Sequence, residues 1–190
     1  MGGQQEADGV IRLKAWQWAL AGGVGLLVAA KAFAGGATPM ADSAQFSPTV
    51  AKRRKNAQTI ERVLRSNGYD YRTVGAAIAN AIGESGLNPD AVGDSGHSVG
   101  VFQLHDQGGG HGMTHAQRSD VATATQALID RELRSGSKHG RNWREVADNP
   151  ASSLGDLTEA WCRFVERPKN QDADSASRRA IAAKLWPELA

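Results

Sequence analysis

The 190-residue chain is 41% hydrophobic and 22% charged, with 22 Lys+Arg against 20 Asp+Glu for a net charge of +2. This length predicts one domain, or one domain with an appendage, and this composition excludes a wholly disordered chain. The near balance of charge gives no sign of nucleic-acid binding, and the single cysteine, Cys162, excludes an intrachain disulfide.

The N-terminal quarter of the chain differs from the rest. After a polar tail, residues 1–15, the segment 16–36 is apolar or glycine apart from Gln17 and Lys31. About 20 such residues can cross a bilayer, so three interpretations stay open: an uncleaved membrane anchor, a secretory signal peptide, or a helix packed on a partner protein. Residues 37–48 are small, polar and interrupted by proline, which is typical of a linker. A folded domain is therefore predicted over 49–190.

The apolar spacing from residue 50 onward is mostly helical. It predicts a first helix ending at Gly68 and a second helix that is N-capped by Asp70 and loosened at its end by Gly83. Residues 86–112 are rich in glycine and are predicted to form a loop or a small β region. Only this segment interrupts an otherwise helical domain.

Further helix starts and stops follow the glycine-rich segment. Thr114 and Gln117 form the capping box of a third helix that should reach Gly136. A short helical turn is expected over 143–147, a helix from Ser153 to Pro168, and a last helix capped by Ser175 and stopped by Pro187. Since no long alternating strand pattern occurs, the predicted fold class is mainly α with a small glycine-rich loop or β insert.

Glu84 stands at the C-terminal end of the second predicted helix, directly before the glycines. The negative end of the helix dipole and apolar neighbours such as Ile82 and Leu87 favour the protonated carboxyl group. A general acid that protonates a glycosidic oxygen needs such a group. The same pattern also fits a plain helix end followed by a loop, because perturbed carboxylates mark sites only statistically.

The motif around Glu84 carries a resemblance to known enzymes. Glu84-Ser85-x-x-x-Pro89-x-Ala91, followed by Gly93 and Gly100-x-x-Gln103, resembles the signature of lytic transglycosylases and goose-type lysozymes. With the late segment from Trp161 to Glu166-Arg167-Pro168, residues 54–186 are most similar to the phage tail lysozyme family. The resemblance implies a lysozyme-like α+β fold. It also implies cleavage of the β-1,4 bond between N-acetylmuramic acid and N-acetylglucosamine, with Glu84 as the acid.

Many glycosidases need a second carboxylate. Asp94 in the glycine-rich insert is the first candidate and Asp106 the next, with Glu166 behind them. Lytic transglycosylases act with the glutamate alone, so water and a substrate hydroxyl both stay open as the attacking group. Substrate contacts are expected from Ser85, His97, Ser98, Gln103 and Glu166.

The histidines and the cysteine carry weaker signals. Four histidines fall within nineteen residues, at 97, 105, 111 and 115. The usual pairs of closely spaced zinc ligands are missing, so neither a metal site nor another cofactor is expected. Cys162 and Trp161 are predicted to lie in the core.

These observations predict a virion-associated muramidase, in the phage tail or interior, that acts in the host periplasm and wall during genome delivery. Its partners would be peptidoglycan glycan strands and, through residues 16–36, other virion proteins or the host inner membrane. No nucleic-acid specificity is expected. The alternatives are a signal-anchor endolysin for host lysis and a non-catalytic ejection protein that only binds glycan.

Overall fold

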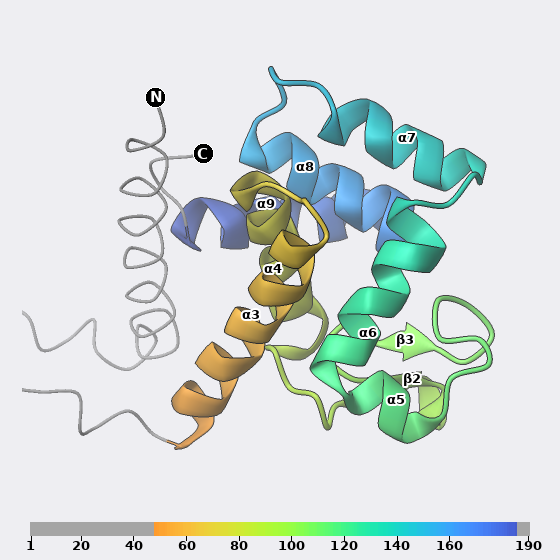
Figure 1. Ribbon diagram of the computed structural model, residues 1–190. Coiled ribbons are helices and arrows are strands. Elements are labelled where there is room, and N and C mark those ends of the chain that lie inside the picture. The colour runs from red at the N-terminus through yellow and green to blue at the C-terminus, as the bar shows by residue number, and fades with distance from the viewer. Residues whose placement is uncertain (1–47, 186–190) are drawn as a thin grey trace, which may run out of the picture. The chain divides into compact units, whose positions relative to one another are not determined.

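The computed structural model describes residues 48–185 (Figure 1). The chain divides into two units between Lys55 and Asn56, and the fold and the site below belong to the second. The predicted tail, apolar segment and linker lie outside the described residues, except that Pro48 already begins a helix. Over residues 48–185, none of the helices combines the length and the apolar character that a membrane span requires. The predicted domain boundaries stay a prediction.

The first two helices follow the predicted signals. Helix α3 (Pro48–Ser66) leads through a turn into α4 (Tyr71–Ser85). The Asp70 carboxylate accepts the Thr73 backbone N–H at 2.8 Å, which confirms the predicted N-cap. Helix α4 continues past Gly83 and ends where Gly86 adopts the left-handed conformation at φ 63°. Glu84 therefore lies in the last turn of a helix that is buried over most of its length.

The glycine-rich insert forms a small antiparallel sheet in the order β1-β2-β3, which confirms the predicted β region. Its strands are β1 (Val92–Gly93), β2 (Ser98–Val99) and β3 (Leu104–His105). A single helical turn, η1 (Asp94–Gly96), joins β1 to β2. Figure 1 shows the sheet beside α5 (His115–Ser119) and α6 (Val121–Leu128), away from the C-terminal helix.

The prediction of one continuous third helix was wrong. Thr114 does form the capping box with Gln117, but α5 ends at Asp120. The Asp120 carboxylate then accepts the Thr123 N–H at 2.8 Å and starts α6 as a separate helix. A π-helical segment, η2 (Ile129–Leu133), follows α6. A second capping residue inside the predicted stretch thus restarts the helix.

The helix that follows η2 is longer than the predicted turn over 143–147. Helix α7 (Lys138–Ala147) begins after Ser137, whose hydroxyl accepts the Gly140 N–H at 3.0 Å. The capping side chain therefore lies six residues earlier than the predicted start.

The next helix begins after Ser153, as predicted. Helix α8 (Leu154–Ala160) starts with a capping box between Ser153 and Asp156. It then widens into the π-helical segment η3 (Trp161–Glu166) just before Pro168. The predicted single helix is therefore present, but its second half has a different winding.

The last helix does not start at Ser175. Helix α9 (Gln171–Leu185) begins four residues earlier, and Ser175 is buried within it. Serine favours helix caps, but here tertiary packing overrides that preference, so residue type alone misplaced this start.

The core joins the helices to the insert. Helix α4 packs on α8 and α9, and Trp161 is fully buried, with its ring 5.4 Å from that of Trp143 and 6.2 Å from that of Phe102. Cys162 is buried as a free thiol. These findings confirm both core predictions and the fold class, a mainly helical domain with a small sheet. The core therefore fixes η3, α7 and the insert relative to one another.

Candidate active site

A cleft of about 640 Å³ lies between the glycine-rich insert and the helices. Its walls bring together Glu84 with five other residues of interest: Asp94, Ser98, Gln103, His105 and Glu166. Four of these five were predicted site residues, and His105 was not. Three other predicted site residues, Ser85, His97 and Asp106, are not among the described residues that line the cleft.

Glu84 reaches the cleft from the last turn of α4 and meets a cation there. The Arg178 guanidinium from α9 donates from Nη2 to Glu84 Oε1 at 2.6 Å. The Arg178 side chain is 9% exposed and that of Glu84 is 20% exposed, so the pair is largely shielded from water. This contact is a charge-assisted hydrogen bond that joins α4 to the C-terminal helix.

Glycine at position 83 makes room for this ion pair. A Cβ atom at Gly83 would collide with the guanidinium of Arg178. The Arg178 side chain therefore lies against α4 at a helix position that has no side chain.

Glu166 is the second carboxylate of this cluster. Its side chain is 7% exposed, and its Oε2 lies 3.9 Å from Arg178 Nε. Burial first, and the negative charge of Glu84 second, raise the pKa of Glu166 well above its ordinary value, while Arg178 opposes the shift. Two carboxylates therefore share one guanidinium. With both carboxylates ionised the cluster would carry one negative charge, and a single proton neutralises it.

The π-helical winding of η3 places Glu166 at the cleft. The segment closes where the Arg167 N–H donates to Cys162 O at 2.8 Å, with Arg167 itself at φ 56°. The Arg167 guanidinium then binds both carboxylate oxygens of Glu132 in η2, at 2.7 and 3.0 Å. This bidentate pair joins the two π-helical segments, and such segments often occur at functional sites.

Asp94 and Ser98 form the opposite wall. The Ser98 hydroxyl donates to Asp94 Oδ2 at 2.5 Å, and Ser98 is buried whereas Asp94 is exposed. Asp94 also adopts a positive φ of 46°, a conformation that is uncommon for residues with a side chain. The carboxylate is therefore held in one place at the open edge of the cleft.

Gln103 braces the same wall. Its amide Nε2 donates to Ala91 O at 3.2 Å and to Gly100 O at 3.0 Å. A Cβ atom at Gly93 would collide with Gln103 Oε1, so the pairing of these two residues in the motif has a steric reason. The Gly-x-x-Gln pattern thus has a structural role in the insert as well as a place in the cleft.

Ser85, His97 and Asp106 hold the insert together. The Ser85 hydroxyl donates to Val101 O at 2.9 Å and so ties the end of α4 to the insert. The His97 Nδ1 lies 2.9 Å from Asp106 Oδ2. This hydrogen bond is the main cause of the lowered pKa of Asp106. The structure therefore does not bring Asp106 into the lining of the cleft beside Glu84.

Comparison with known families now adds to this geometry. The model of the phage tail lysozyme family matches residues 55–189. The chain belongs to the phage tail lysozyme family. No curated protein and no solved structure matches it. Membership supports a phage-associated, lysozyme-like role in the degradation of peptidoglycan, and a virion-associated protein that acts on the cell wall.

The sequence of this chain did not reveal Arg178. The residue lies in a polar stretch of α9, 94 positions after Glu84, and no local pattern distinguishes it from its neighbour Arg179. Gly83 could have pointed to such a partner, because a glycine inside an apolar helix often marks a position that another group approaches closely. The ion pair between Arg167 and Glu132 was equally invisible in the linear sequence.

Proposed function

We propose that this protein cleaves the β-1,4 bond between N-acetylmuramic acid and N-acetylglucosamine of peptidoglycan, with Glu84 as the general acid. The observation that carries the proposal is the pair of carboxylates, Glu84 and Glu166, that line an open cleft and share the Arg178 guanidinium. A pair of carboxylates in different environments is the usual means of glycosidic acid catalysis.

Glu166 has the role of a proton store in this proposal. Because burial keeps its carboxyl protonated at a higher pH than an ordinary glutamate, it holds the proton of the pair while Arg178 binds the Glu84 carboxylate. A glycan in the cleft places its glycosidic oxygen at Glu84. The proton moves from Glu166 to Glu84 and then to the leaving oxygen as the C–O bond breaks, which leaves both carboxylates ionised beside one guanidinium.

Asp94 has the role of the base for water. It is exposed in the opposite wall, and Ser98 fixes its orientation. In an inverting hydrolase the second carboxylate activates a water molecule across the sugar ring. The product of the Asp94→Asn variant tests this role: loss of products with reducing ends supports it, whereas unchanged formation of 1,6-anhydro ends assigns the attack to a hydroxyl of the substrate.

The deciding experiment compares wild type, Glu84→Gln and Glu145→Gln on a peptidoglycan zymogram. Glu145 is an exposed glutamate of α7 outside the cleft, so its substitution controls for the loss of one negative charge. Clearing by wild type and Glu145→Gln but not by Glu84→Gln supports the proposal. Equal clearing by all three, or clearing by none, contradicts it, and the second result favours a protein that only binds glycan.

The place of action is part of the proposal. We propose that the protein travels in the virion, in the tail or interior, and opens the wall locally during genome delivery. Mass spectrometry that finds the full chain in purified virions supports this location. Its absence from virions, together with accumulation in infected cells before lysis, favours the endolysin role.

A further inference from the structure

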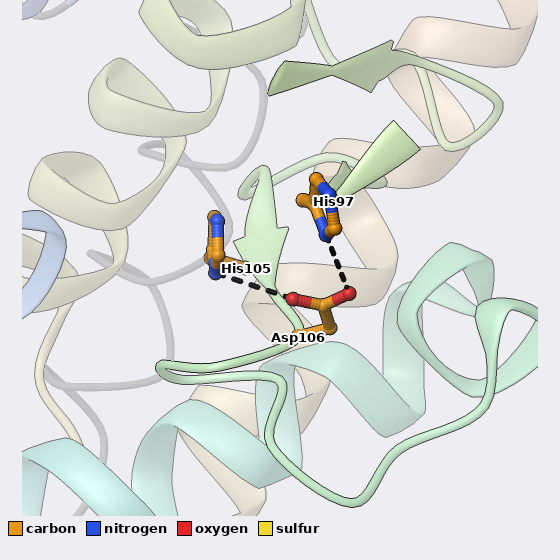
Figure 2. Close-up of side chains that lie close together, drawn as sticks. All are labelled: His97, His105 and Asp106. Carbon is orange, nitrogen blue, oxygen red and sulfur yellow. Dashed lines mark hydrogen bonds and ion pairs between the residues drawn. The ribbon is translucent and has the colours of Figure 1, made fainter. Parts of the chain in front are cut away.

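Apart from the cluster around Glu84, three side chains that could bind a metal ion lie together at the small sheet. His97, His105 and Asp106 are brought together there, and Figure 2 shows both imidazole rings directed at the carboxylate. The Nδ1 atom of His97 is 2.9 Å from Asp106 Oδ2, and that of His105 is 3.4 Å from Asp106 Oδ1. One donor atom from each residue lies within 4.8 Å of the other two.

The backbone fixes these three residues before any ligand arrives. Strands β2 and β3 pair with Ser98 opposite His105, and the Asp106 N–H donates to His97 O at 3.1 Å. The buried Arg118 guanidinium also donates to His97 O, and to Leu104 O at 3.0 Å. Both histidine-bearing segments are therefore held by one side chain from α5, which reduces the entropy lost when the site binds an ion.

The donor set matches a transition-metal ion. Zinc binds imidazole nitrogen and carboxylate oxygen at about 2.0–2.2 Å, so ligand atoms of a tetrahedral site lie about 3.4 Å apart. The present separations of 2.9 and 3.4 Å lie just below or at that value. The imidazole planes are nearly parallel, at 18° to each other, and both Nδ1 atoms are directed at Asp106 (Figure 2). An ion bound at the two Nδ1 atoms and the carboxylate displaces two surface hydrogen bonds, His97–Asp106 and the Gln107 N–H to His105 Nδ1.

Exposure and charge set the character of such a site. The three side chains are 52%, 41% and 36% exposed, so an ion keeps access to water at its remaining positions. Asp106 Oδ1 makes no hydrogen bond of good geometry within residues 48–185 and has lone pairs to offer. The positive charge of Arg118 acts on Asp106 and weakens cation binding, so the affinity should lie below that of closed four-ligand zinc sites.

We propose that His97, His105 and Asp106 bind one divalent transition-metal ion of the zinc type. The ion joins the loop before β2 to the end of β3. Ser98 in β2 and Asp94 in η1 line the cleft, so the bound ion stabilises this wall of the cleft. The fold thus unites histidines whose linear spacing gave no metal signal.

The test uses the full chain, freed of metal by a chelator and then titrated with Zn²⁺ in a calorimeter. We expect one ion bound per chain. His97→Gln and Asp106→Asn should each weaken Zn²⁺ binding by about 10- to 100-fold or more. Loss of a residue that only hydrogen-bonds to a metal ligand already has an effect of that size. His139→Ala is the matched control, since His139 is an exposed histidine of α7 outside the cluster. It should leave binding unchanged.

Co²⁺ provides an independent readout, since its visible absorption reports coordination by the protein. A Co²⁺ spectrum in wild type and His139→Ala that is absent from Asp106→Asn supports the site. Far-UV circular dichroism and a melting curve without metal establish that the two cluster variants are folded. The proposal is overturned if wild type binds no Zn²⁺, if binding survives in both cluster variants, or if His139→Ala abolishes it.

Discussion

Glu166 combines burial with a negative neighbour, and this combination has a thermodynamic consequence. A carboxyl group whose pKa is raised on folding stabilises the folded state while it is protonated. This stabilisation is lost as the pH rises from the ordinary pKa of a glutamate through the raised pKa of Glu166. The arrangement at the cleft therefore costs stability at the pH where the enzyme would act.

The Glu166→Gln variant should show this cost. We expect the free energy of unfolding of wild type to fall, relative to the variant, as the pH rises from about 4.5 towards 8, because only wild type must ionise a buried carboxyl. Urea unfolding at a series of pH values measures the difference. Parallel curves for the two proteins across this range would contradict the proposed protonation of Glu166.

Gly83→Ala should lower both activity and stability. The added methyl group displaces the Arg178 guanidinium from Glu84, and loss of a charge-assisted hydrogen bond of about 1.5–3 kcal/mol should lower activity by about 10- to 100-fold. The unfolding free energy should fall by about the same 1.5–3 kcal/mol, less the roughly 1 kcal/mol by which alanine favours the helix. Turnover of peptidoglycan and urea unfolding are measured together.

Gly155→Ala is the matched control for that experiment. Gly155 lies in α8, where an added Cβ meets Arg179 only at 3.5 Å, an ordinary contact distance. Activity should be retained. Equal activity of both glycine variants would show that the position of Arg178 does not matter.

The sequence allowed Glu84 and several cleft residues to be predicted, for a clear reason. The Glu-Ser and Gly-x-x-Gln patterns are local, and local geometry places Ser98, Gln103 and Glu84 in one cleft. Arg178 was missed because its role depends on how α9 packs on α4, which no window of sequence contains. The role of Ser85 as a substrate contact stays a prediction, and its hydroxyl also has a structural partner in the Val101 carbonyl.

At the scale of secondary structure, capping side chains divide the helical part of the chain. Asp70, Thr114, Ser137 and Ser153 all accept backbone N–H groups at helix starts. These signals are readable in the sequence, and the two that were overlooked, Asp120 and Ser137, are of the same kind. The π-helical segments are different, because their winding follows from tertiary packing rather than from residue type.

Asp120→Ala should destabilise the junction of α5 and α6. Loss of the cap is expected to cost about 1 kcal/mol of unfolding free energy. The loss should shrink as the pH falls through the lowered pKa of Asp120, since the protonated carboxyl is a weaker acceptor. Urea unfolding at neutral and acid pH measures both effects.

Asp148→Ala is the control, since Asp148 is an exposed residue at the C-terminal end of α7, where an acid does not help the helix dipole. Its unfolding free energy should be unchanged or slightly higher. A loss as large as that of Asp120→Ala would contradict the capping explanation.

At the scale of the whole domain, one aromatic cluster supports both the fold and the site. Trp161 contacts Trp143 of α7 and Phe102 of the insert, and it opens the π-helical segment that carries Glu166. The hydrophobic pattern predicted that Trp161 would be buried. It did not predict the two partners, because they come from other parts of the chain.

Trp161→Ala should therefore have a large effect. Removal of a fully buried indole is expected to lower the unfolding free energy by about 3–5 kcal/mol. Thermal and urea unfolding measure the loss, with Trp161→Phe as a control that should lose less. A change below about 1 kcal/mol would mean that the cluster is not the centre of the core.

The ion pair between α4 and α9 also has a consequence for biosynthesis. Its two residues are 94 positions apart, so a ribosome that has made α4 has not yet made the cation that pairs with Glu84. A nascent or truncated chain that ends before α9 (Gln171–Leu185) carries the whole Glu-Ser motif but lacks Arg178. We therefore expect unfinished chains to lack the proposed activity, because the last helix supplies the partner of Glu84.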